Sequence, residues 1–137
     1  MQDEKLLDIL VSLGKKCSSF EAVPRKRWGL SPSEYRCLIC LLPEEKISCQ
    51  HLSERVELSV SRSSRIIEGL YRKGFLERAD CTSDRRCKEV WLTARGIQAR
   101  LNIHSHLELC EERLLAEIPE ERLAGLKADL KELAVKF

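Results

Sequence analysis

Seven cysteines give this 137-residue sequence its widest range of possible chemistry. Cys37, Cys40 and Cys49 form a C-x2-C-x8-C pattern, and three thiolates within reach of one another can hold zinc or part of an iron–sulfur cluster. The sequence does not identify a fourth ligand. The alternative is that "CLICLL", residues 37–42, is an apolar helix in which cysteine packs as a small hydrophobic side chain. The spacing alone leaves both interpretations open.

A second pair of cysteines, Cys81 and Cys87, brackets two arginines, Arg85 and Arg86. These arginines and Lys88 favour the thiolate form of a neighbouring cysteine. If the two thiols face each other across a hairpin, oxidation would join them and change the shape of the turn. The pair is therefore a candidate redox site. The alternative is that exposed thiols at these positions have no role.

The stretch "LSVSRSSRIIEGLYRKG", residues 58–74, combines serines and arginines with a helical repeat of apolar residues. Serine is a poor filler of helix interiors because its hydroxyl competes for backbone hydrogen bonds, so its abundance indicates a face that is not buried. At about 100° per residue, Ser63, Ile67 and Leu70 lie on one side, which we expect to pack in the core. The residues expected to face outward are Ser61, Arg62, Ser64 and Arg65.

Small hydroxyls and arginines on one helix face are typical of DNA recognition in the major groove. Serine lets the backbone approach the DNA closely, and arginine reads the N7 and O6 atoms of guanine. Residues 59–100 hold ten Lys and Arg against five Asp and Glu, in a chain whose net charge is only +2. Such a basic region is expected where a protein meets a polyanion, although a merely solvated charged face is the alternative.

The segment "DCTSDRRC", residues 80–87, joins two short segments of alternating character and predicts a hairpin. Arg85 and Arg86 would lie at its turn, where an arginine can enter a narrow minor groove. A nearby acid, Asp84, can orient them through charge-assisted bonds. We therefore predict DNA contacts from Asp84, Arg85 and Arg86, with a salt-bridged surface hairpin as the alternative.

The elements that would position these residues follow from periodicity and from helix caps. Ser31, Pro32 and Glu34 form a strong helix start, because a capping serine is followed by proline and by an acid that can bond back to the cap. Ser59 is expected to cap the serine-rich helix, and Gly74 to end it in the left-handed conformation. The predicted elements are helices over 3–20, from 31, over 47–57 and over 59–74, strands over 75–79 and 88–93, and helices over 94–117 and from 119.

The two ends of the chain carry apolar stripes that need a partner. A break containing Pro24, within "VPRKRWG", is expected after the first helix. The stripes repeat at spacings of three and four residues, which favours packing against another helix or a second subunit. The first stripe comprises Leu6, Leu10, Leu13, Cys17 and Phe20, and the second Leu123, Leu126, Leu130, Leu133 and Phe137.

Composition excludes several classes of protein. We find no apolar run long enough to span a membrane and no leader-like start, so a cytoplasmic location without membrane association is expected. The odd number of cysteines argues against a disulfide framework. An enzyme is the weakest class, since the sequence has no phosphate-binding glycine loop, no nucleotide fingerprint and no Ser/His/Asp constellation.

The run from Leu30 to Gly96 resembles the MarR family of transcriptional regulators. The motifs that carry the resemblance are "LSPSEY", "LSVSRSSRIIEGLYRKGFLERA", "DCTSDRR" and "VWLTARG", in that order. The resemblance implies a homodimer that binds double-stranded DNA at a near-palindromic operator and often represses neighbouring genes. It also implies major-groove contacts from Ser61, Ser64 and Arg65, a minor-groove contact from Arg86, and a response to a small-molecule effector, an oxidant or a metal.

The expected fold is mainly α with a small β-wing, a winged helix-turn-helix with N- and C-terminal dimerisation helices. Residues 1–137 would form one MarR-like domain, with a DNA-binding lobe over 30–93 and dimerisation helices over 1–22 and 97–137. The alternative function is a winged-helix protein-interaction module without specific DNA binding. No cofactor is needed for the fold, although zinc or an iron–sulfur cluster is possible at the cysteines.

Three residues depart from the usual family pattern. Ser63 stands where an apolar β-branched residue is common, Gly69 interrupts the serine-rich helix, and Trp91 occupies a strand position that is usually small or polar. Glycine costs roughly 1 kcal/mol in a helix interior. We therefore expect this helix to be unusually adjustable.

Overall fold

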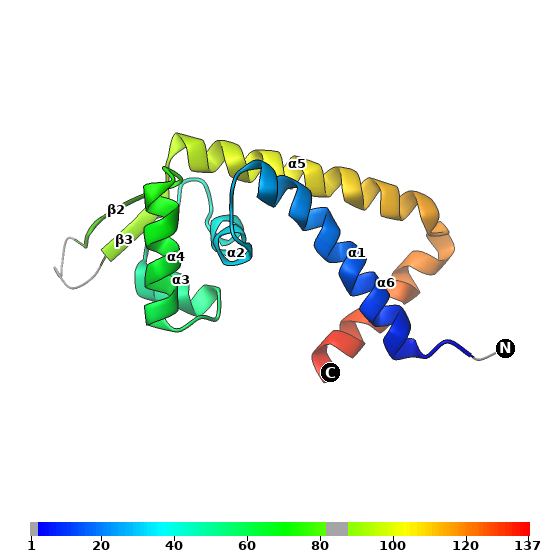
Figure 1. Ribbon diagram of the computed structural model, residues 1–137. Helices are drawn as coiled ribbons and strands as arrows, with labels where there is room; N and C mark the ends of the chain where they lie inside the picture. The colour runs from blue at the N-terminus through cyan, green and yellow to red at the C-terminus, as the bar shows by residue number, and fades with distance from the viewer. Residues whose placement is uncertain (1–2, 82–87) are drawn as a thin grey trace. The chain divides into compact units, whose positions relative to one another are not determined.

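The computed structural model describes residues 3–81 and 88–137. It divides into two compact units, Met1–His104 and Ser105–Phe137, with the boundary inside a long helix. The first unit holds α1 (Leu6–Arg27), α2 (Pro32–Cys40), β1 (Ile47–Ser48), α3 (Cys49–Arg55), α4 (Val60–Arg72), β2 (Leu76–Asp80), β3 (Lys88–Leu92) and the start of α5 (Ala94–Glu117) (Figure 1). The second unit holds the rest of α5 and α6 (Glu120–Lys136).

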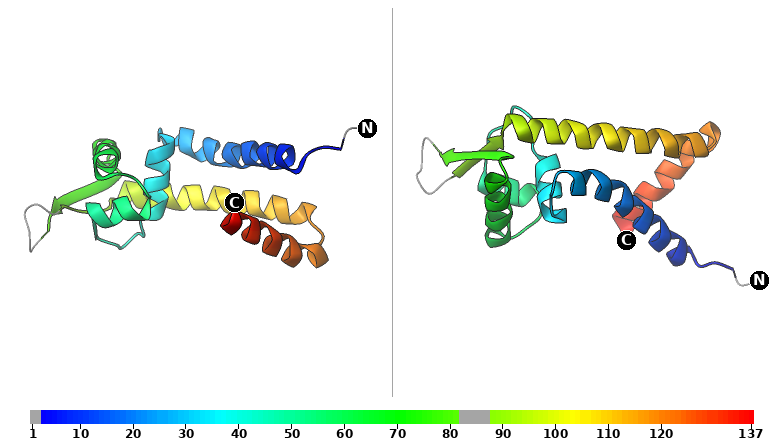
Figure 2. Two further views of the ribbon diagram at one scale, coloured as in Figure 1. Left: turned by 90° about the horizontal axis from the view of Figure 1, so that it is seen from below. Right: turned by 45° about the horizontal axis from the view of Figure 1, so that its top comes forward.

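The first unit is a winged helix-turn-helix, as the sequence predicts. α3 and α4 are the helix-turn-helix pair, and the β2–β3 hairpin lies beside α4 in both views of Figure 2. The fold is mainly helical with one small antiparallel sheet, of strand order β1-β3-β2. The most deeply buried core side chains come from α2, α3, α4, β2, β3 and α5 and from the residues that follow α2 and α4: Tyr35, Leu38, Leu41, Leu52, Leu70, Phe75, Leu76, Val90 and Ile103.

A third strand joins the predicted hairpin. Ile47 pairs with Val90 and Ser48 with Glu89, on the edge of β3 away from β2. The sequence placed Ile47 and Ser48 at the start of the third helix, because two residues are too short for a strand alternation to be seen. Ser48 does cap that helix, since its hydroxyl accepts a hydrogen bond from the His51 amide at 3.1 Å.

The expected break at Pro24 is wrong, because α1 continues through this proline to Arg27. An interior proline lacks the amide hydrogen and costs about 3 kcal/mol. Here the Pro24 ring is buried, and the last turn is closed by two further bonds, from the Leu30 amide to the Arg25 carbonyl and from the Gly29 amide to the Lys26 carbonyl. Gly29, at φ +67, makes this closure possible.

The predicted end of α4 at Gly74 is confirmed, and the motif that follows it holds the wing against α5. Gly74 has φ +84, and its carbonyl accepts a hydrogen bond from the Thr93 hydroxyl at 2.6 Å. That hydroxyl in turn accepts from the Gly96 amide at 3.1 Å. A Cβ on Gly96 would lie 2.2 Å from the Phe75 carbonyl oxygen, so only glycine fits there.

The turn between α3 and α4 contains a strained residue. Glu57 has φ +56, and the turn closes with bonds from the Glu57 amide to the Glu54 carbonyl and from the Leu58 amide to the Ser53 carbonyl. This is the position at which glycine usually ends a helix, because a Cβ is disfavoured in the left-handed region.

Replacing Glu57 with glycine is therefore expected to raise the free energy of unfolding by about 1 kcal/mol. Urea unfolding of the purified protein would measure the change. Glu57→Ala is the matched control, because it removes the same charge but keeps the strained Cβ, so it should give none of the gain. A loss of stability in Glu57→Gly would contradict the role of strain.

Within the part of the chain that the structure describes, none of the helices combines the length and the apolar character needed to cross a membrane.

Candidate nucleic-acid interface

The candidate interface is the exposed face of α4, which begins at a serine cap. Ser59 is extended at φ −62 and ψ 154, and its hydroxyl accepts a hydrogen bond from the Arg62 amide at 3.3 Å. This confirms the predicted cap. Beyond it, Ser63, Ile67 and Leu70 are buried on the inner side of α4, as the sequence predicts. The four predicted contact residues are all exposed: Ser61, Arg62, Ser64 and Arg65.

The serine hydroxyls are used differently from what the sequence suggests. The Ser63 hydroxyl donates to the Ser59 carbonyl at 2.9 Å, and the Ser64 hydroxyl donates to the Val60 carbonyl at 2.8 Å. Ser63 is thereby satisfied inside the core, which explains why a polar residue can stand there. Ser64 remains exposed, but in this arrangement its oxygen can only accept a further hydrogen bond.

Gly69 lets α2 approach α4 closely, which differs from the adjustable helix that we expected. A Cβ on Gly69 would lie 2.7 Å from Oε2 of Glu34. The other carboxylate oxygen of Glu34 accepts from the Ser31 amide at 2.8 Å and from Lys73 Nζ at 2.6 Å. The carboxylate therefore completes the predicted α2 capping box and ties α2 to the end of α4.

The electrostatics of Glu34 show how firmly it is held. Its burial acts to raise the pKa of the carboxyl, but hydrogen bonds from Lys73 and Ser31 and the charge of Lys73 outweigh burial, so the pKa is lowered from its ordinary value. A buried carboxylate with a charged partner resists displacement.

The wing is fixed to the same helix by Arg78. Its guanidinium pairs with Glu68 of α4 and lies 4.2 Å from the centre of the Tyr71 ring. Farther along the hairpin, Lys88 pairs with Asp80 across β2 and β3. The Arg78 contacts hold β2 beside α4, and the Lys88–Asp80 pair joins the two strands near the turn. The predicted wing contacts Asp84, Arg85 and Arg86 lie outside the described residues.

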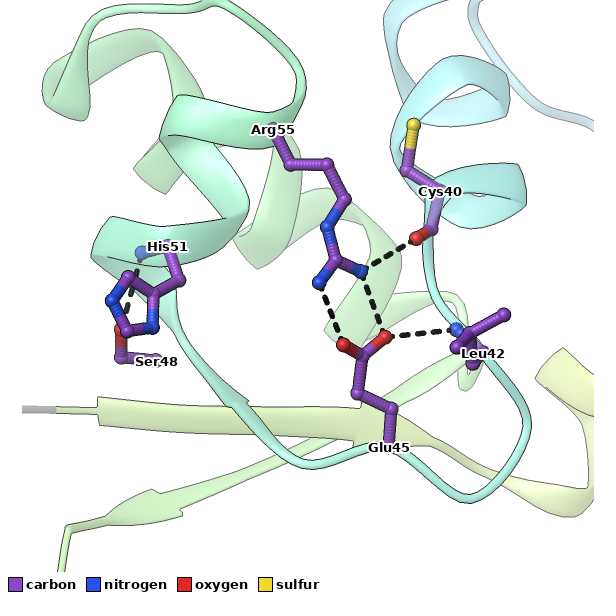
Figure 3. Close-up of polar contacts among 6 residues, drawn as sticks. All are labelled: Cys40, Leu42, Glu45, Ser48, His51 and Arg55. Carbon is purple, nitrogen blue, oxygen red and sulfur yellow. Dashed lines mark hydrogen bonds and ion pairs between the residues drawn. The ribbon is translucent and has the colours of Figure 1, made fainter.

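A charged clamp holds α3, the other helix of the helix-turn-helix, to α2 (Figure 3). Arg55 donates two hydrogen bonds to the Glu45 carboxylate, at 2.6 and 2.7 Å, and a third to the Cys40 carbonyl at 2.9 Å. Glu45 also accepts from the Leu42 amide at 3.1 Å. These hydrogen bonds lower the pKa of Glu45 from 4.5 to about 2.

The clamp predicts an acid-dependent loss of stability. Above pH 4.5 Glu45 is ionised in both folded and unfolded chains, so the clamp contributes fully, and its contribution is lost as the pH falls toward its folded pKa of about 2. Glu45→Gln should cost about 1 kcal/mol at pH 7, a modest value because solvent screens the pair. The difference from wild type should shrink toward zero as unfolding is measured at lower pH.

The exposed neighbour Glu44 supplies the control for this clamp. Glu44→Gln removes the same charge and should change the free energy of unfolding little, both at pH 7 and at lower pH. An effect of Glu45→Gln that did not depend on pH would mean that the clamp is not ionic.

A cavity of about 400 Å³ opens beside the exposed face of α4. It lies between the first residue of α3, the middle of α4 and the turn end of β2 and β3, and Ser64 of the interface is part of its wall. The lining residues are Cys49, Ser64, Ile67, Tyr71, Arg78, Ala79 and Lys88.

The cysteines do not assemble a metal centre in the described part of the chain. No group of three or more His, Cys, Asp or Glu side chains there could hold a metal ion. Cys37 is only 2% exposed, and burial, with smaller contributions from Cys40 and Cys49, raises its pKa to about 12. Burial also raises the pKa of Cys49, against the charges of Arg78 and Lys88. The prediction of zinc or an iron–sulfur cluster thus finds no support here.

The wing cysteines can be described only in part. Cys81 is disulfide-bonded, whereas Cys87 lies outside the described residues. The redox role of this pair stays a prediction.

Comparison with known proteins decides the family. The MarR family model matches residues 30–88, the segment that contains α2, α3, α4 and the first strand of the hairpin. Residues 30–88 form a MarR family domain. The HTH-type transcriptional regulator PapX of Escherichia coli is 26% identical over 98 residues, which cover 70% of this chain and 60% of PapX.

Solved structures share the fold of this chain at lower sequence identity. Streptococcus pneumoniae FabT in complex with DNA has a TM-score of 0.80 and 18% identity, covering 95% of each chain. RV1404 from Mycobacterium tuberculosis has a TM-score of 0.80 and 17% identity, covering 98% of this chain and 95% of its own. At these identities the likeness concerns the fold.

Proposed function

We propose that this chain is a sequence-specific DNA-binding regulator of transcription. The observation that carries the proposal is the exposed face of α4, where Ser61, Arg62, Ser64 and Arg65 stand clear of the core in a MarR family domain. In a winged helix-turn-helix the second helix of the pair enters the major groove. The fold likeness to FabT, whose structure contains DNA, supports the same orientation.

We propose that the chain binds DNA as a homodimer, since both units leave apolar side chains exposed on their helices. In the first unit, α1 exposes Leu6 by 64% and Leu13 by 48%. In the second unit, α6 buries none of its residues and exposes Leu130 by 45%, and Phe137, directly after α6, is 95% exposed. Apolar surface of this kind favours association, and a two-fold dimer matches two half-sites about one helical turn apart.

The test is to select binding sequences from a random duplex pool with the purified full chain and then to measure affinity and mass. The proposal expects a near-palindromic site, a dimer by sedimentation, and affinity that falls steeply with salt. A stable monomer that binds the site tightly would overturn the dimer. Absent or salt-insensitive binding would favour the alternative, a module that docks a protein partner.

We also propose that the chain represses transcription and releases DNA when a small organic anion enters the cavity beside α4. The cavity is lined by Arg78 and Lys88, which would exchange their carboxylate partners Glu68 and Asp80 for the anion, and an occupant would touch Ser64 of the interface. Promoter-driven transcription in vitro tests repression directly. Ala79→Phe, which places a ring in the cavity, should keep operator affinity and lose the response to any carboxylate that releases the wild type.

A further inference from the structure

Val60 is an exposed apolar residue at the start of α4, on the side of the helix that Ile67 continues into the core. It is the first residue of α4, and its side chain is 65% exposed. Among the described residues of the first unit, no large apolar side chain is more exposed. It also lies apart from α1, which carries the exposed apolar residues assigned above to the dimer.

The local structure does not need an apolar side chain at Val60. Ser59 already caps the helix, and the apolar contact that often fixes a helix start involves the residue before the cap and the fourth helical residue. The fourth helical residue here is Ser63, which is buried and bonded to the Ser59 carbonyl. An exposed valine that neither caps nor packs is available to a partner.

The hydrogen-bonding groups around Val60 are largely occupied. The Val60 carbonyl accepts from the Ser64 hydroxyl, and Ser61 Oγ lies 3.4 Å from Ser59 Oγ, within hydrogen-bond range. Val60 is therefore the apolar group at this end of the interface, beside the exposed Arg62 side chain. The C5-methyl of thymine is the apolar group that a base edge offers in the major groove.

We infer that Val60 reads the methyl group of a thymine in each operator half-site. The inference rests on the proposed function, because it needs α4 in the major groove.

The experiment replaces each thymine of the selected operator with deoxyuridine, which removes only the methyl group. With the wild type, one symmetric pair of thymines should weaken binding by about fifteenfold when both half-sites are changed, since each lost methyl contact is worth about fourfold. With Val60→Ala the same replacement should have a smaller effect, because alanine has one methyl group where valine has two. Val60→Ile, which keeps an apolar branch, should restore the sensitivity.

The outcomes separate this inference from the proposed function. Wild-type protein that binds its operator but ignores every thymine methyl would overturn the role of Val60 and leave the proposed function intact. If Val60→Ala is as sensitive to the loss of the thymine methyl as the wild type, another residue contacts that methyl, and this outcome too would overturn the role of Val60. Failure to bind any duplex would overturn the proposed function itself.

Discussion

Arg65→Ala is expected to weaken operator binding by at least thirtyfold, because a bidentate arginine–guanine contact is worth about 1–3 kcal/mol and a dimer loses two of them. The structure places Arg65 on the exposed face of α4, and the inner side of the helix is held by Ile67 and Leu70. Removing the side chain should therefore leave the fold unchanged. Fluorescence anisotropy with the selected operator would measure the loss.

The conservative variant Arg65→Lys distinguishes base reading from simple charge attraction. Lysine keeps the positive charge but lacks the planar fork that bonds to two atoms of guanine. It should retain the salt dependence of binding and lose discrimination at one base pair of each half-site. If lysine restored both affinity and discrimination, Arg65 would be a phosphate contact and not a base contact.

Arg27→Ala supplies the control for charge. Arg27 is exposed in the same unit, at the end of α1 and outside both α4 and the hairpin. It removes an identical side chain from a surface that the proposed function does not use. Operator affinity should stay close to that of the wild type, and an equal loss in both variants would mean that net charge alone governs binding.

Local signals in the sequence predicted the ends of the helices well. Ser31 and Ser59 cap their helices as expected, and Gly74 ends α4, because a cap is decided by residues three or four apart. The same signals placed the outward face of α4 correctly. They could not show that the Ser64 hydroxyl donates to the Val60 carbonyl, since a serine side chain can hydrogen-bond to several backbone partners and the sequence does not say which.

Contacts between distant residues were missed. β1 exists because Ile47 meets Val90, which lies 43 positions away, and α1 continues past Pro24 because that ring is buried. Val60 was also overlooked, although an apolar residue between two serines at the start of the helix was a visible signal. The wing contacts Asp84, Arg85 and Arg86 remain predictions.

Gly69→Ala is expected to destabilise the protein by about 1–2 kcal/mol, against the usual rule for helices. Helix propensity alone predicts that alanine would raise the free energy of unfolding by about 1 kcal/mol. The new Cβ would lie 2.7 Å from Glu34 Oε2, and the carboxylate cannot simply turn away because Ser31 and Lys73 hold it. Overpacking of this kind costs about 1–3 kcal/mol, and displacing Glu34 would also weaken its charge-assisted bonds.

Gly14→Ala tests the propensity term by itself. Gly14 lies inside α1 of the same unit, and a Cβ there would meet nothing within 4 Å. This substitution should stabilise the chain by up to about 1 kcal/mol. Opposite signs at Gly14 and Gly69 in urea unfolding would show that the contact with α2, and not the helix, decides the effect.

A double-mutant cycle with Glu34 completes the test, because it removes the obstacle and leaves the helix unchanged. In a Glu34→Ala background, Gly69→Ala should become stabilising by about 1 kcal/mol. The sign reversal follows from space alone, since α2 then presents no carboxylate to α4. If Gly69→Ala destabilised both backgrounds equally, another neighbour would require the glycine. If Gly69→Ala stabilised both backgrounds, the close approach of α2 to α4 would not depend on Gly69.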